Sequence, residues 1–132
     1  MRRPRLTNFM RAEDGTAALE FAIVGNAFIM FLVAVFYLGL MLWDSSSLDW
    51  AVQKGARLAA LSSSVSQSDV STAVNGYLNS IGISNATVSY SVAASSGVNV
   101  ATVSATMTKT YTVPLFSDVH LTLTSTAKVP QP

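Results

Sequence analysis

The chain has 132 residues, of which 50% are apolar and only 11% are charged. Soluble domains average about 25% charged residues, so this composition favours a membrane protein with room for one small domain. A formal net charge of +1 gives no basis for nucleic-acid binding. The absence of cysteine excludes disulfides and thiolate metal sites, and the single histidine, His120, leaves no histidine metal cluster. We therefore expect no metal and no cofactor.

Residues 1–15 form a short segment ahead of the first apolar run. Pro4 and Gly15 argue against a continuous helix here. Glu13 and Asp14 offset part of the positive charge, which comes from Arg2, Arg3, Arg5 and Arg11. We expect this segment to be a cytoplasmic leader.

Residues 21–43 form an uninterrupted apolar run of 23 residues without a charge. A helix of that length rises about 34 Å, enough to cross a hydrocarbon core of about 30 Å. Large apolar side chains lie on every side, so a helix lying flat on the membrane is not indicated. A buried core helix is the alternative. A cleaved secretory signal is disfavoured because its apolar part is shorter and ends in small residues.

The placement of arginines predicts the orientation of this membrane helix. Four arginines precede the run, whereas Asp44 and Asp49 follow it before the first cation, Lys54. By the positive-inside rule, the N-terminus lies in the cytoplasm and the C-terminal part lies outside it.

The helix is expected to continue past the membrane as one long helix over residues 16–62. Apolar residues recur at helical spacing beyond Trp43, and no proline or glycine pair interrupts the chain before Lys54. The stripe consists of Leu48, Val52, Ala56, Ala59 and Ala60. A run of three serines from Ser62 then ends it.

Residues 63–132 predict a small α+β domain outside the membrane. Ser66 or Ser68 can cap a short helix over residues 69–78, and Gly82 suits its end. One side of that helix is apolar, through Val70, Ala73, Val74, Tyr77, Leu78 and Ile81.

Three strand-like runs follow and predict an antiparallel meander with one apolar face and one face of serine and threonine. The first run alternates at Val88, Tyr90 and Val92. The second is expected to end at Pro114. Val98 and Val100 are out of phase with the later alternating apolar residues of this strand, which predicts a bulge near Ala101. The residues of the second strand that alternate onto the expected apolar face are Val103, Ala105, Met107, Lys109, Tyr111 and Val113. The third strand opens with Val119, Leu121 and Leu123. The short helix and the outer end of the long helix are the available covers for this sheet.

Two polar residues in or beside the apolar run could each have more than one structural role. Glu20 stands at its very start and could be a boundary residue that reaches the headgroups and favours the helix N-terminus. Asn26 lies within it and could form a hydrogen bond across helices or to its own backbone.

Two motifs connect the chain to a known family. Residues 13–23 read Glu-Asp-Gly-Thr-Ala-Ala-Leu-Glu-Phe-Ala-Ile, and the apolar run follows at once. Residues 55–60 read Gly-Ala-Arg-Leu-Ala-Ala. In these stretches, and in its threonine-rich C-terminal strands, the chain resembles the TadE-like minor pseudopilins of the tight-adherence (Flp-type IV) pilus system. Most of the resemblance is carried by residues 13–61, and it implies a pilin-like fold.

The resemblance implies that a prepilin peptidase cuts between Gly15 and Thr16. The new amine of Thr16 would then lie one helical turn from Glu20, and the two could pair within one chain or between neighbours. Glu20 and Phe21 become the implied assembly and recognition residues. A signature at the end of the long helix is implied for Gly55, Ala56 and Arg57.

The implied function is that of a structural or assembly subunit, not an enzyme, of the bacterial inner membrane. It acts within the filament or only at its base. Its implied partners are the prepilin peptidase, other minor pseudopilins, the major Flp pilin, the inner-membrane assembly platform and the lipid bilayer. The alternative is an unprocessed, single-pass, signal-anchored binding module in the periplasm. The mature N-terminus distinguishes the two.

Overall fold

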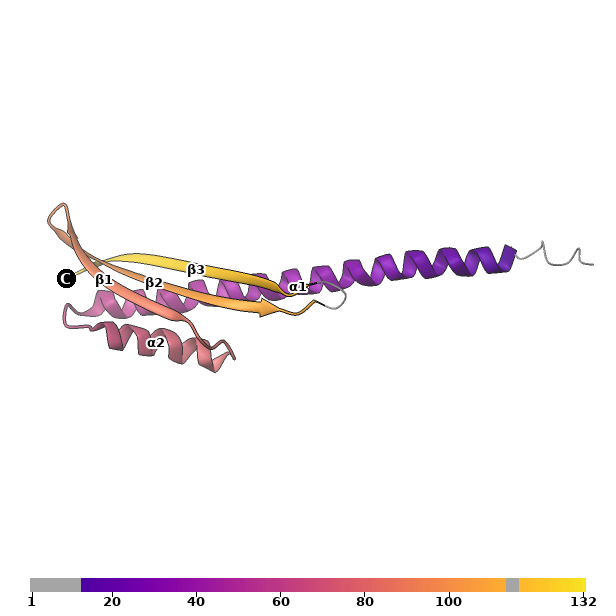
Figure 1. Cartoon of the computed structure of the whole chain (residues 1–132). Coiled ribbons are helices and arrows are strands. Elements are labelled where there is room, and N and C mark those ends of the chain that lie inside the picture. The colour runs from indigo at the N-terminus through magenta and orange to yellow at the C-terminus, as the bar shows by residue number, and fades with distance from the viewer. Residues whose placement is uncertain (1–12, 114–116) are drawn as a thin grey trace, which may run out of the picture. The chain divides into compact units, whose positions relative to one another are not determined.

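The computed structural model describes residues 13–113 and 117–132. The chain divides into two compact units, Met1–Leu38 and Gly39–Pro132. The fold is α+β, as predicted, with two helices followed by three strands (Figure 1). Helix α1, Glu13–Leu61, contributes to both units.

The described part of α1 includes Glu13, Asp14 and Gly15, which lie before the predicted start of the long helix at residue 16. A single glycine costs a helix only about 1 kcal/mol, which a long apolar helix tolerates. Pro4 and the four arginines lie outside the described residues. The predicted end of the helix is confirmed, because α1 stops at Leu61, before the serine run.

Helix α2, Gln67–Ser80, is longer than the predicted 69–78. Ser66 is its N-cap: the serine hydroxyl accepts from the Asp69 backbone N–H at 3.2 Å, and the Ser66 backbone N–H donates to the Asp69 carboxylate at 2.9 Å. This reciprocal capping box decides between the two candidate caps. Ile81 caps the other end, and Gly82 follows with φ +80°, a conformation that favours glycine.

The strands β1 (Thr87–Ser95), β2 (Val98–Tyr111) and β3 (Val119–Gln131) form an antiparallel sheet in the order β1-β2-β3. Ser95 pairs with Val98, and Ser96 and Gly97 between them both have positive φ, which suits a tight two-residue hairpin. The predicted meander is confirmed. The second strand ends at Tyr111, before the predicted stop at Pro114, which lies outside the described residues.

The predicted bulge near Ala101 is absent from the described pairing of β1 with β2. Val92 pairs with Ala101, Ala93 with Val100, and the register continues unchanged to the hairpin. Val98 and Val100 point to the other face simply because the strand alternates, and Val98 is exposed near the hairpin. The two valines lie on the same face as Thr102 and Ser104, away from the helices, so they require no irregularity.

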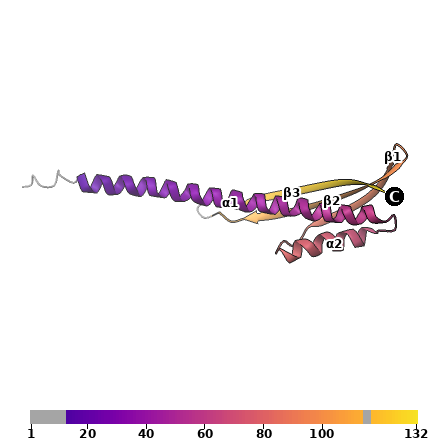
Figure 2. The ribbon, with the colours of Figure 1, turned by 180° about the vertical axis from the view of Figure 1, so that it is seen from behind.

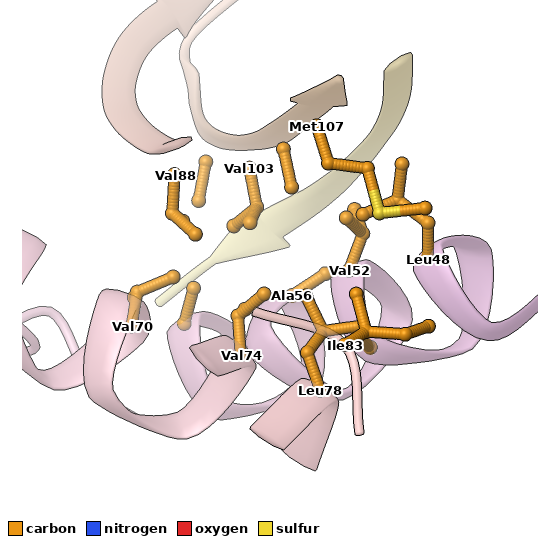
Figure 3. Packing of buried hydrophobic residues seen from close by; sticks show 14 residues of the cluster. Leu48, Val52, Ala56, Val70, Val74, Leu78, Ile83, Val88, Val103 and Met107 are labelled. Atoms are coloured by element: carbon orange, nitrogen blue, oxygen red, sulfur yellow. The ribbon is translucent and has the colours of Figure 1, made fainter. Parts of the chain in front are cut away.

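The core lies between the apolar face of the sheet and the two helices. Helix α2 and the last turns of α1 lie on the same face of the sheet (Figures 1 and 2). The close-up in Figure 3 shows side chains from all three elements meeting there. They include Leu48, Val52 and Ala56 of α1, Val70, Val74 and Leu78 of α2, and Val103 and Met107 of β2. The predicted covers and apolar stripes are thus confirmed.

The opposite face of the sheet carries the predicted serine and threonine coat. Side chains on β2 pair with their cross-strand neighbours on β3, as in Thr106 with Thr124 at 3.1 Å and Thr108 with Thr122 at 3.2 Å. His120 is exposed, and its Nδ1 lies 2.8 Å from the Thr110 hydroxyl. Such pairs stabilise a sheet face that meets water.

Candidate functional site

Gly15 and Thr16 lie near the start of the described part of α1, and both are exposed. The described chain therefore leaves the bond between them accessible from outside.

Glu20 and Phe21 follow on the same helix, and both side chains are exposed. Glu20 is four residues from Thr16, so the structure places these two residues on one side of α1, one turn apart. The four predicted residues at this end of α1 therefore lie together, Thr16 and Glu20 on a common side.

The segment around them is apolar and uncovered. Among the described residues, one helix is long and apolar enough to cross a membrane, Gly15–Leu61, and its most apolar window is not buried within the chain. Large side chains such as Phe21, Phe28 and Phe31 are exposed there. An exposed apolar surface of this extent requires lipid or other helices around it. The helix thus fits a single-pass membrane anchor.

The Gly55–Ala56–Arg57 motif belongs to the other unit, and its parts have different environments. A Cβ added at Gly55 would lie 2.6 Å from Cγ2 of Val74 and 3.3 Å from Cγ1 of Val70. Ala56 is buried in the core, whereas Arg57 is exposed. Gly55 and Ala56 are therefore where α1 and α2 pack closely, and only Arg57 is free to face a partner.

A buried carboxylate that the sequence analysis did not single out lies just past the apolar run. Asp44 is 3% exposed and accepts from Nζ of Lys109 at 2.7 Å and from the hydroxyl of Tyr111. Burial, and then the hydrogen bond and the negative charge of Asp44, raise the pKa of Tyr111. The network ties the end of β2 to α1 because both partners come from one strand.

A signal for this network was present in the sequence. Lys109 and Tyr111 alternate in phase with Val103 and Met107 and so belong to the same face of β2, and Val103 and Met107 are buried. A lysine on the apolar face of a strand needs an acidic partner, and Asp44 is one of few acids in the chain.

Two glutamines complete the polar contacts of the domain. Gln67 donates from Nε2 to the Val88 carbonyl at 2.8 Å and accepts from the Tyr90 N–H at 2.7 Å, so its amide substitutes for a neighbouring strand at the β1 edge. Gln131 donates from Nε2 to the Ser62 carbonyl at 2.9 Å, just past the end of α1. These contacts hold the sheet on the helices.

A third contact joins the outer surfaces of the two helices. The rings of Trp50 and Tyr77 lie 4.3 Å apart, and Nζ of Lys54 is 4.1 Å from the Trp50 ring centre. A cation over an aromatic face is attracted by the ring electrons. Within the described residues, no group of three or more histidine, aspartate or glutamate side chains is placed to hold a metal ion.

Comparison with protein families finds a match over the part of the chain that contains Gly15, Glu20 and the Gly55–Ala56–Arg57 motif. A family model described as TadE-like protein matches residues 15–57. No curated protein and no solved structure matches the chain. The matched segment starts at Gly15, includes Glu20, and ends at Arg57.

Proposed function

From the premise that residues 15–57 are TadE-like, we propose that this chain is a minor pseudopilin of a Tad pilus system. In this proposal it is a structural or assembly subunit, not an enzyme. It is made as a precursor, anchored in the inner membrane by α1, and cut by a prepilin peptidase between Gly15 and Thr16. Its C-terminal domain lies in the periplasm.

The observation that carries the proposal is the position of the matched segment. The match spans the exposed apolar part of α1 and ends in the buried Gly55–Ala56 packing point. A plain membrane anchor requires only apolarity and length. Here the matched residues also include Gly15 and Glu20 at one end and a helix–helix contact at the other.

Processing would change the chemistry of the first turn. The cut would place a positive amine on Thr16, one turn from the carboxylate of Glu20. At the edge of a membrane this pair is poorly hydrated, so its attraction is stronger than in water. Pairing with the amine of a neighbouring subunit would hold two helices side by side in register.

The domain supports a structural role. Its buried carboxylate, Asp44, has Lys109 and Tyr111 as partners, and its two glutamines satisfy backbone groups. The partners that fit are those of a filament-assembly subunit: the peptidase, other minor pseudopilins, the major Flp pilin, the assembly platform and the bilayer.

The mature N-terminus tests the proposal. Mass spectrometry of the chain from a host with the cognate peptidase should give a mass that starts at Thr16. Gly15→Val should block the cut, because a branched side chain obstructs an extended backbone in a protease site, whereas Gly25→Val, the matched control further along α1, should be cut normally. A wild-type chain that keeps Met1 in that host would favour the alternative, an unprocessed signal-anchored module.

Membrane orientation provides a second test. A reporter enzyme that is active only in the periplasm should be active when fused after Pro132. Activity of a cytoplasmic reporter at the same fusion point would contradict the proposed orientation.

A further inference from the structure

Asn26 is a polar residue in the middle of an apolar surface. It is exposed on α1, five residues after Phe21, which places it about 8 Å into the hydrocarbon region. Within the described part of the chain, no hydrogen bond to the Asn26 amide is found. Its short side chain cannot reach the headgroups from that depth as a long lysine or arginine can.

An unpaired amide in hydrocarbon costs several kcal/mol. The helix's own backbone can satisfy only half of this demand. It offers carbonyl oxygens to the NH₂ group, but the backbone N–H groups in mid-helix are already used, so the amide oxygen stays without a donor. A second asparagine supplies both a donor and an acceptor, which makes the amide self-complementary.

The residues beside Asn26 permit another helix to approach closely. Ala22 is one turn before it, and Gly25 is adjacent on the same side of α1. A Cβ added at Gly25 would meet nothing within 4 Å, in contrast to Gly55, where it would collide with Val74. Packing within the described chain therefore does not require a glycine at position 25, although glycine weakens a helix by about 1 kcal/mol.

We propose that the membrane part of α1 binds the same helix of a second copy of this chain, through an Asn26–Asn26 hydrogen bond. Ala22 and Gly25, which precede Asn26 on the same side of the helix, form the close contact next to it. Both helices cross the membrane in the same direction, so the two asparagines meet at one depth. A second copy is the occupant that matches because it presents the same amide at that depth.

This contact is separate from the proposed cleavage and pairing site. Asn26 is six residues from Glu20, a rotation of about 120° around the helix. The surface exists whether or not residues 1–15 are removed. An uncut Gly15→Val chain should therefore self-associate as wild type does, so failure of the processing proposal and failure of this one are distinguishable.

The chain contains no cysteine, which makes single-cysteine cross-linking free of background. The full chain should be expressed alone in bacterial inner membranes, without other pilus components, and oxidised. Ala22→Cys and Ile29→Cys lie on the Asn26 side and should form disulfide dimers. Val24→Cys and Phe31→Cys are the matched controls on the other side and should stay monomeric, because a disulfide requires Cα atoms within about 7 Å.

Asn26→Leu in the Ala22→Cys chain should weaken dimerisation about tenfold, the size of an interhelical hydrogen bond in a membrane. Asn26→Gln keeps the amide and should retain most of it, and Gly25→Leu should block the close approach. Equal cross-linking on both sides, no cross-linking, or unchanged cross-linking in the Asn26→Leu chain would overturn the proposal. Cross-linking that appears only when other pilus components are co-expressed would assign the surface to a different helix and also overturn it.

Discussion

The two parts of helix α1, residues 13–38 and 39–61, each contain an acidic residue and a glycine, but in different environments. In residues 13–38 an acid, Glu20, is exposed, and a Cβ added at a glycine, Gly25, would meet nothing within 4 Å. Residues 39–61 place an acid, Asp44, and a glycine, Gly55, in the core of the second unit. Partners within the chain explain the second pair, whereas our proposals assign the first pair to contacts with the membrane and with other chains. The comparison thus separates residues that the fold requires from residues that we propose to act in assembly.

The largest effect is expected at Glu20 and only on assembly. Glu20→Gln removes the charge that would pair with the Thr16 amine but is as long and cheaper to bury. We expect this chain to be inserted and cut at Gly15, with loss of pili and poor co-purification with partner pseudopilins. Glu20→Asp should be intermediate. Pilus counts and pull-down yields measure this, and wild-type pili from the Glu20→Gln strain would reduce Glu20 to a boundary residue.

The second test exchanges the glycines. Gly55→Val should destabilise the domain by about 1–3 kcal/mol, the typical cost of overpacking, because even its Cβ would lie 2.6 Å from Cγ2 of Val74. Gly25→Val should leave domain stability unchanged, since nothing lies near it within the described chain. Thermal unfolding of both full-length variants in detergent compares them. Equal melting temperatures would mean that α1 and α2 do not pack as described.

The third test concerns the buried acid. Asp44→Asn leaves Lys109 without its counter-charge and should cost about 1.5–3 kcal/mol, the value of a hydrogen bond to a charged group. Chemical denaturation of this variant should show the loss, and Asp49→Asn, an exposed acid on the same helix, is its control. A stable Asp44→Asn chain would show that the network does not hold β2 to α1.

Tyr111 predicts a pH dependence of that network. Its pKa is raised in the folded chain above the ordinary value of 10.0, so the folded state favours the neutral hydroxyl. The corresponding stability is fully present below about pH 10 and is lost as the pH rises beyond it. The stability difference between wild type and Tyr111→Phe should therefore be constant from pH 7 to about pH 9 and shrink above about pH 10. A difference that grows with pH would contradict the assignment.

The smallest expected effect is at the start of α2. Ser66→Ala should cost about 1 kcal/mol, a typical value for an N-cap serine. Ser68→Ala should be close to neutral, since Ser68 lies within the helix. The hydrogen bonds from Ser66 also lower the pKa of Asp69. The stability that these hydrogen bonds give to the folded chain should therefore be lost as the pH falls through that lowered pKa. Equal effects of the two substitutions would contradict the capping box.

The sequence by itself determined the elements whose causes are local. Twenty-three uncharged residues predict a helix long and apolar enough to cross a membrane, without reference to any other part of the chain. The apolar stripes of α1 and α2 and the alternation of the strands depend only on periods of 3.6 and 2 residues, so the α+β architecture and most of its core could be predicted. The same local reasoning placed Thr16 and Glu20 one turn apart.

Only the tertiary structure decided the contacts between residues far apart in the chain. Asp44 meets Tyr111 across 67 positions, and Gln131 reaches the end of α1 across about as many. The sequence marked Gly55 only as part of a signature, and the structure adds that Val74 of α2 lies against it. Valines at 98 and 100 suggested a bulge, but the unbroken pairing of β1 with β2 places them on the serine and threonine face of a regular strand. Such contacts depend on how elements pack, and packing is set by shapes that meet only after the chain has folded.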